Sequence, residues 1–146
     1  MELILWRHAE AEDGLPDRER ALTRRGRKQA RAVAKWLARR LPERCTVLVS
    51  PTVRAQQTAA ALARKRVTAA EVDVGASARR VLARTGWPDA RGAVLVVGHQ
   101  PTLGRIAARV LAGSEADWSI RKGAVWWIAR RDGEVVLRAA IDPDLV

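Results

Sequence analysis

Both histidines of the chain directly follow short apolar runs that end at polar residues. His8 comes after the run from Leu3 to Arg7, and His99 comes after Val94 to Gly98. Neutral imidazole can act as a nucleophile or can exchange protons near neutral pH. One histidine after a strand is more often structural than catalytic. Two of them, each beside an arginine or a helix start, indicate a reaction site, because buried cations need an anionic partner.

A third apolar run leads into a segment that carries another cation. The run from Cys45 to Val49 is followed by Ser50 and then by Arg54, while Arg7 stands immediately before His8. Guanidinium groups bind phosphate oxygens in pairs of hydrogen bonds, so arginines beside a histidine suit a site for phosphate or another anion. No acidic cluster indicates a metal site. We expect neither a metal nor another cofactor.

The apolar runs alternate with segments of helical periodicity, which predicts an α/β fold with buried parallel strands joined by helices. We expect helices over residues 24–40 with Thr23 as the cap, over 52–64, from Ser77, and from 101 or 102 to 111, ending at Gly113. A hairpin around Asp132-Gly133 then adds antiparallel strands. Since ligands bind at the carboxyl ends of parallel strands, both histidines and Ser50 to Arg54 should meet at one edge of the sheet.

The size and composition of the chain limit what it can be. Its 146 residues predict one domain, residues 1–146, and 48% hydrophobic with 29% charged residues is typical of a soluble globular protein. No apolar run approaches the roughly 20 residues of a membrane span, and no signal peptide opens the chain, so we expect a cytoplasmic protein. The single cysteine, Cys45, excludes an internal disulfide, and one cysteine with two histidines is too few for a structural zinc site.

The formal charge of +11 indicates an anionic partner. Eleven basic residues lie between Arg18 and Arg44, opposed only by Glu19 and Glu43. Six of them form the outer face of the helix expected over residues 24–40: Arg24, Arg27, Lys28, Arg31, Lys35 and Arg39. This face is either an ordinary solvated surface or a surface that steers an acidic phosphoprotein toward the site. Charge alone would also fit a module that binds nucleic acid, but no nucleic-acid-binding motif occurs.

The chemistry-bearing residues also resemble the signature of the histidine phosphatase superfamily, formerly grouped with the phosphoglycerate mutases. Arg7-His8-Ala9 is similar to its Arg-His-Gly, Leu22 to Gly26 to its Leu-Thr-x-x-Gly, Ser50 to Ala59 to its Ser-Pro-x-x-Arg-Ala-x-x-Thr-Ala, and Val97 to Pro101 to its second-histidine motif. Arg-His-Ala-Glu-Ala together with Gly-His-Gln-Pro-Thr-Leu resembles the SixA-type phosphohistidine phosphatase branch. The resemblance implies a phosphoglycerate mutase-like three-layer α/β/α sandwich. Ala9 stands where the superfamily has glycine, so the backbone there cannot require a glycine-only conformation.

The resemblance also implies roles for individual residues. His8 would be the nucleophile that carries a transient phosphohistidine, and Arg7 and Arg54 would hold the phosphoryl oxygens. His99 would donate a further hydrogen bond to those oxygens, and Arg20 would belong to the phosphate pocket. We also expect Ser50 to contact the substrate. Larger members take a general acid from a mid-chain insertion, which residues 74–77 do not supply; the substitutes left open are Glu10, Glu71 and Asp73.

The missing general acid favours one class of substrate. An alkoxide needs a proton as it leaves, whereas imidazole leaves as a weak base whose conjugate acid has a pKa of about 6.5. We therefore expect a monomeric, metal-independent phosphatase that acts on phosphohistidine in a signalling or phosphotransfer protein domain. The alternatives are a phosphatase of small phosphoester metabolites in the same fold and a non-catalytic module that binds polyanions. We expect no membrane partner and no nucleic-acid partner.

Overall fold

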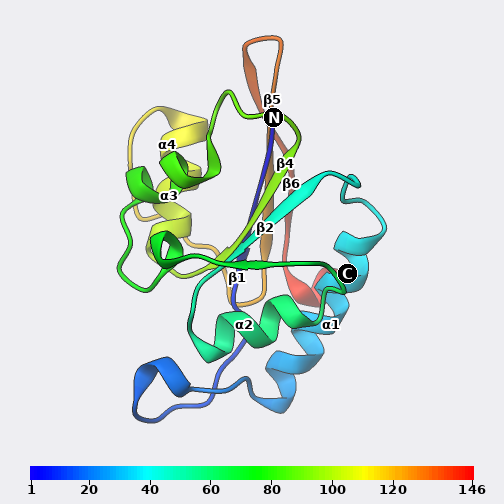
Figure 1. Ribbon diagram of the computed structural model, residues 1–146, viewed down its shortest axis with the longest axis vertical. Coiled ribbons are helices and arrows are strands. Elements are labelled where there is room, and N and C mark those ends of the chain that lie inside the picture. Colours follow the sequence, from blue (N-terminus) through cyan, green and yellow to red (C-terminus); the bar gives the residue numbers. More distant parts are fainter.

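The computed structural model describes residues 1–146, which fold around a six-stranded sheet (Figure 1). The strands are β1 Glu2–Arg7, β2 Cys45–Val49, β3 Val67–Thr68, β4 Ala93–Gly98, β5 Val125–Arg131 and β6 Glu134–Ile141. Their order in the sheet is β3-β2-β4-β1-β5-β6. The first four strands run parallel, and β5 and β6 are antiparallel. The predicted α/β class, with a mostly parallel sheet and antiparallel strands at one edge, is confirmed.

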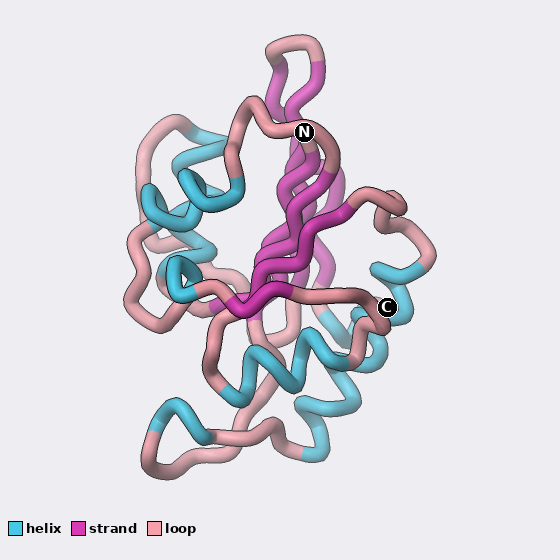
Figure 2. The backbone as a smooth tube through the Cα atoms, viewed as in Figure 1, coloured by secondary structure: helices cyan, strands magenta, loops and turns pink.

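Helices cover both faces of this sheet, so the molecule has three layers (Figures 1 and 2). The helices are α1 Arg24–Ala38, α2 Val53–Ala60, α3 Ala78–Thr85 and α4 Thr102–Ala112. Successive side chains of a strand point to opposite faces, so Trp6 packs in the same core as Leu37 of α1, while Leu5 packs in the core that contains Ile106 of α4. No helix combines the length and the hydrophobicity that crossing a bilayer would require.

The helix boundaries follow the expected capping residues. The Thr23 side chain accepts a hydrogen bond from the Gly26 amide at 2.9 Å, and Ser77 caps α3 in the same way. Gly113 ends α4 with a φ of +87°. Two helices are shorter than expected: α2 ends at Ala60 instead of near residue 64, and α1 ends at Ala38. Beyond the end of α2, the Arg64 guanidinium donates to carbonyl oxygens of the loop that follows α1.

The hairpin is confirmed and is longer than the sequence indicated. Asp132 and Gly133 both have positive φ, 51° and 80°, the geometry of a two-residue turn between antiparallel strands. The sequence reasoning missed β3, because two residues are too few to show a periodicity. A short 3-10 turn, Ala70–Val72, follows β3.

Candidate active site

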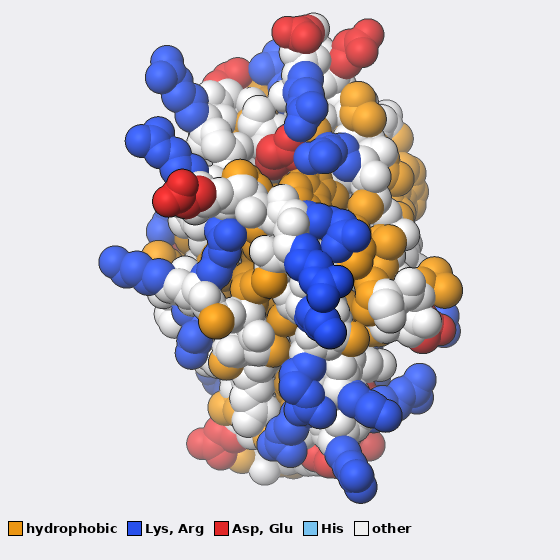
Figure 3. All heavy atoms as spheres, turned by 90° about the vertical axis from the view of Figure 1, so that its right-hand side faces the viewer, with side chains coloured by type: hydrophobic (Ala, Val, Ile, Leu, Met, Phe, Trp, Pro, Cys, Tyr) orange, Lys and Arg blue, Asp and Glu red, His pale blue; other side chains and the backbone are white.

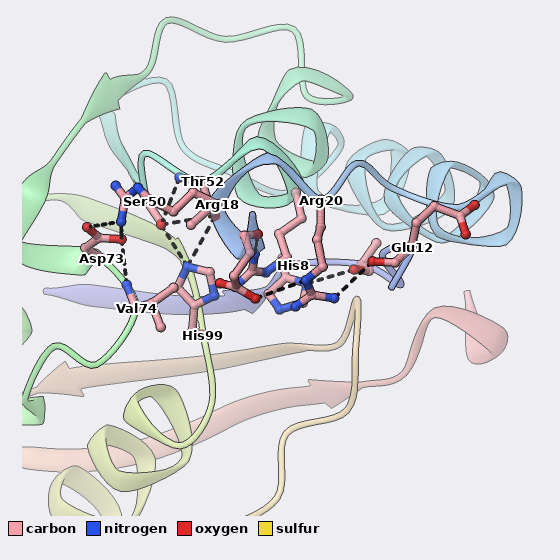
Figure 4. A network of polar contacts seen from close by, with 12 residues as sticks. His8, Glu12, Arg18, Arg20, Ser50, Thr52, Asp73, Val74 and His99 are labelled. Carbon is pink, nitrogen blue, oxygen red and sulfur yellow. Dashed lines mark hydrogen bonds and ion pairs between the residues drawn. The ribbon is translucent and has the colours of Figure 1, made fainter. Parts of the chain in front are cut away.

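The strand register brings the three polar segments to one edge of the sheet. Arg7 of β1 pairs with Gly98 of β4, so His8 and His99 follow at the same level, with ring centroids 5.2 Å apart. Ser50 follows Val49 of β2, which pairs with the neighbouring position of β4. The expected meeting of these segments at the carboxyl ends of the parallel strands is therefore confirmed, and Figure 4 shows the residues together.

His8 is buried, and one of its ring nitrogens is bound to the backbone. Its Nδ1 lies 2.8 Å from the carbonyl oxygen of Ala9, and the residue is 7% exposed. Since a carbonyl oxygen only accepts hydrogen bonds, Nδ1 carries the proton and the neutral ring keeps its lone pair on Nε2. Burial is the main cause that lowers the pKa of His8 to about 3, and the nearby charges of Arg54 and Arg7 act in the same direction. Near neutral pH, Nε2 is therefore an unprotonated nitrogen able to attack an electrophile.

His99 is oriented by two hydroxyl groups beneath it. Its Nε2 lies 2.7 Å from Ser50 Oγ and 3.4 Å from Thr52 Oγ1 (Figure 4). The Ser50 hydroxyl also accepts from the Thr52 amide at 3.3 Å. Burial lowers the pKa of His99 to about 4, so this ring is neutral as well. Ser50 is fully buried and holds His99 in place; its contact with a substrate stays a prediction.

Arg7 and Arg54 present buried donors that the protein does not satisfy. Arg7 donates to the carbonyl oxygen of Ile120 at 2.9 Å, and burial lowers the pKa of its guanidinium. Arg54, only 4% exposed, donates through both terminal nitrogens to Asp17, at 2.8 Å to the carbonyl oxygen and 3.1 Å to the carboxylate. The Nε–H groups of both arginines are buried and have no protein acceptor. A buried donor without an acceptor costs about 1–3 kcal/mol, so this pair indicates a binding site for an anion.

Asp17 is a site residue that the sequence reasoning missed. Its carboxylate also accepts from Arg20 Nε at 3.0 Å, so one carboxylate bridges Arg54 and Arg20. The hydrogen bond from Arg54 holds the pKa of Asp17 below its usual range. Arg20 donates as well to the carbonyl oxygen of Glu12 at 3.1 Å (Figure 4). The structure thus places Arg20 near Arg54, with the Asp17 carboxylate between them. In the sequence, only the three-residue spacing between Asp17 and Arg20 indicates this carboxylate.

The three acidic residues considered as proton donors are each paired with an arginine. The pairs are Glu10 with Arg25 at 3.7 Å, Glu71 with Arg84 at 3.8 Å, and Asp73 with Arg18 at 2.9 Å. Figure 4 places the Asp73 pair on the His99 side of the site. A charged carboxylate accepts hydrogen bonds and donates none. None of the three is thus held as a proton donor, and no group of three or more His, Cys, Asp or Glu side chains could hold a metal ion.

Contacts with α1 and α2 fix the loop that follows His8. The Glu10 carbonyl oxygen accepts from the Thr23 amide at 3.0 Å, and a Cβ on Gly26 would overlap this same carbonyl group. The Ala9 amide donates to Thr58 Oγ1 at 3.0 Å. Thr23, Gly26 and Thr58 therefore position the backbone next to the His8 ring, Gly26 by its lack of a side chain and the two threonines through hydrogen bonds.

Known proteins share both the sequence pattern and this architecture. The family profile described as histidine phosphatase superfamily (branch 1) matches residues 3–77. An uncharacterized protein of Picosynechococcus sp. is 32% identical over 158 residues, which cover 99% of this chain and 93% of that protein. The structure of the protein histidine phosphatase SixA complexed with tungstate is 25% identical, with a TM-score of 0.84 over 99% of this chain and 98% of that one. The alpha-ribazole phosphatase from Shigella flexneri shares the fold, with a TM-score of 0.75 at 20% identity over 98% and 97% of the two chains.

Proposed function

The chain belongs to the histidine phosphatase superfamily, and on that premise we propose that it is a metal-independent phosphatase that removes the phosphoryl group from phosphohistidine on a signalling or phosphotransfer protein. One observation carries the proposal: the buried Nε–H groups of Arg7 and Arg54 lack a protein acceptor in the site where His8 keeps a free lone pair. A dianionic phosphoryl group supplies the missing acceptors and the electrophile together.

In the proposed first step, His8 Nε2 attacks the phosphorus atom in line with the substrate imidazole. The bond between phosphorus and the substrate nitrogen breaks as the new bond to Nε2 forms. The Nε–H groups of Arg7 and Arg54 bind the phosphoryl oxygens, where negative charge must be stabilised. When the Ser50 hydroxyl donates a hydrogen bond to His99 Nε2, the neutral His99 ring carries its proton on Nδ1. This Nδ1–H group then donates a hydrogen bond to the phosphoryl oxygens.

In the second step, water attacks the phosphorus atom and the bond to His8 Nε2 breaks, which releases inorganic phosphate. The phosphorylated ring keeps its Nδ1 proton, because that proton is donated to the carbonyl oxygen of Ala9. His8 therefore leaves as neutral imidazole and returns to its starting state without a separate proton donor. The Ala9 carbonyl group also stabilises the positive charge of the phosphorylated ring.

The carboxylates around the site support phosphohistidine as the substrate. An alkoxide leaving group needs a proton, but Asp17 and Asp73 are both ion-paired with arginines. A phosphohistidine ring that is protonated on its second nitrogen leaves as neutral imidazole and needs no donor. The lack of a free proton donor therefore supports phosphohistidine as the substrate, as the anion-binding arginines do.

Phosphate release from a substrate panel tests the proposal. The purified protein is incubated with a phosphohistidine peptide, with phosphoramidate, and with glycerate and sugar phosphates. We expect kcat/KM for phosphohistidine to exceed that for the phosphoesters by about 100-fold or more. Efficient hydrolysis of the phosphoesters with phosphohistidine left intact would instead assign the chain to small metabolites. No hydrolysis of any compound, together with salt-sensitive binding to polyanions, would support a non-catalytic module.

A further inference from the structure

A groove of about 860 Å³ opens beside the active site and shares Arg7 with it. Residues of α1 form one wall, and the rest of the groove is lined by the loop before β5 and by the C-terminal turn, which is the short 3-10 helix Pro143–Leu145 with Asp142 before it. We call it the basic groove. Its lining includes the cations Arg7, Arg25, Lys28, Arg121 and Lys122 and the acids Glu10, Asp142 and Asp144. Cations outnumber acids there, so the groove favours a ligand of net negative charge.

The lysines of the basic groove have no acidic partner. Arg25 pairs with Glu10 at 3.7 Å and Arg121 with Asp142 at 3.3 Å, whereas neither Lys28 nor Lys122 lies within ion-pair distance of a carboxylate. The other cations on the outer face of α1 are also unpaired: Arg24, Arg27, Arg31, Lys35 and Arg39. Figure 3 shows Lys and Arg side chains as a band on the side of the molecule that carries α1.

Because the active site is buried, a protein substrate that reaches it also lies against this groove. His8 and His99 are only 7% and 4% exposed, so a phosphorylated side chain must enter the pocket while the rest of the substrate stays outside. The loop from residues 119 to 124 connects the two places, because the Gly123 amide donates to the carbonyl oxygen of His8 at 3.1 Å. The chain on one side of the phosphorylated residue can therefore lie in the basic groove.

The lining distinguishes a protein partner from a nucleic acid. The groove has no aromatic side chain on which a base could stack, and its hydrophobic contribution is Ala32 alone. Glu10, Asp142 and Asp144 would repel a continuous phosphate backbone. A protein segment rich in carboxylates can place them on the lysines and avoid the acidic positions.

We propose that the basic groove docks an acidic segment that flanks the phosphohistidine of a protein substrate. The proposal rests on the proposed function, because it names the kind of protein that this site accepts. Carboxylates of the segment pair with Lys28 and Lys122, which raises the association rate and selects among phosphohistidine proteins. The preference weakens as salt concentration rises, because the lysines are exposed to solvent.

Two phosphohistidine peptides of equal length test the docking, one flanked by glutamates and one by glutamines. The wild-type protein should hydrolyse the glutamate peptide with a kcat/KM about tenfold higher at low salt. The double variant Lys28→Glu/Lys122→Glu should lose this preference or reverse it. The preference of the wild type should likewise shrink when salt is raised, since a Debye length falls to about 3 Å at 1 M.

A charge-matched variant separates docking from the overall charge of the molecule. Arg79→Glu/Arg80→Glu changes two exposed, unpaired cations on α3, on the opposite face of the sheet, and should keep the preference for the glutamate peptide. The docking proposal would be overturned if the wild type hydrolysed the two peptides with equal kcat/KM. It would also be overturned if both double variants lost the preference for the glutamate peptide to the same extent. Inhibition by oligothymidylate that disappears only in the Lys28 and Lys122 variant, without any glutamate preference, would also overturn it. Failure to hydrolyse either peptide or phosphoramidate would reject the proposed function itself.

Discussion

The active-site pocket and the outer face of α1 are both rich in cations, but they hold positive charge in different ways. Arg54 in the pocket is 4% exposed and is fixed by two hydrogen bonds to Asp17. Arg31 on the outer face of α1 is exposed and has no ion pair. The pocket therefore fixes a few charges in defined directions, whereas the helix carries many charges that water and salt screen.

This difference decides how strongly each region acts on an anion. Two unit charges 4 Å apart interact by about 1 kcal/mol in bulk water and about 4 kcal/mol at the effective dielectric of a partly buried site. The pocket can thus stabilise a transition state, while the helix face acts mainly on encounter and selection. Substitutions in the pocket should therefore cost several kcal/mol of transition-state stabilisation. Single substitutions on the helix face should change the free energy of unfolding by only a few tenths of a kcal/mol.

His8→Ala tests the core of the pocket. Turnover of phosphoramidate should fall by about 10,000-fold or more, because the nucleophile is lost while the rest of the site remains. Phosphate release measures turnover, and circular dichroism checks that the fold is kept. Wild-type protein quenched during turnover should carry acid-labile phosphate that the variant lacks. Retained turnover in the variant would remove His8 from the role of nucleophile.

Arg54→Ala removes one of the two buried donors that lack a protein acceptor. We expect kcat/KM to fall about 100- to 1,000-fold, corresponding to about 2.7–4 kcal/mol of transition-state stabilisation. Arg54→Lys should recover little, because an ammonium group cannot bind Asp17 and also present the inner Nε–H group. Arg79→Ala on α3 is the surface control. A comparable loss in that control would contradict the contrast between the two regions.

The pH dependence of stability reports on the two buried histidines. Histidine has a pKa near 6.5 in an unfolded chain, but about 3 for His8 and about 4 for His99 in the folded chain. Below pH 6.5 the unfolded state takes up protons that the folded state does not, so the free energy of unfolding decreases as pH falls. The decrease should be about 2 kcal/mol per histidine between pH 7 and pH 5.

Urea unfolding at several pH values measures this decrease. The double variant His8→Asn/His99→Asn should show a much shallower pH dependence over the same interval, because asparagine does not titrate. An unchanged slope in that variant would mean that other groups cause the pH dependence.

Arg31→Ala tests the helix face. Arg31 is exposed, has no acidic partner and lies in the middle of α1, and alanine is a slightly better helix former. The free energy of unfolding should change by no more than about 0.5 kcal/mol in either direction. Urea unfolding at pH 7 measures it. A loss of 2 kcal/mol or more would contradict the view that this face is a solvated surface that contributes little to the fold.

The sequence predicts those parts of the site that depend on local patterns. Apolar runs mark the strands, and the parallel arrangement then places His8 and His99 at one edge, as the pairing of Arg7 with Gly98 shows. Thr23 is identifiable as a helix cap because capping depends on neighbouring residues. Motif similarity adds Arg54, whose position at the start of α2 follows from the same strand-to-helix turn.

Other parts of the site depend on contacts between distant segments. Asp17 reaches Arg54 only because the loop between β1 and α1 folds back over the start of α2, and no periodicity marks that fold. Ser50 faces inward to His99, which its place in a motif does not reveal. The basic groove combines α1 with the C-terminal turn, segments that are more than 100 residues apart. Such contacts are determined by packing and not by local sequence.

The unsatisfied donors of Arg7 and Arg54 also affect how the protein folds. Water satisfies both Nε–H groups in the unfolded chain, whereas the folded protein offers them no acceptor of its own. An anion that binds only the folded chain restores those hydrogen bonds and shifts the folding equilibrium toward the native state. Activity and intrinsic stability therefore make opposite demands on this pocket, and apolar substitutions that abolish catalysis there can make the fold more robust.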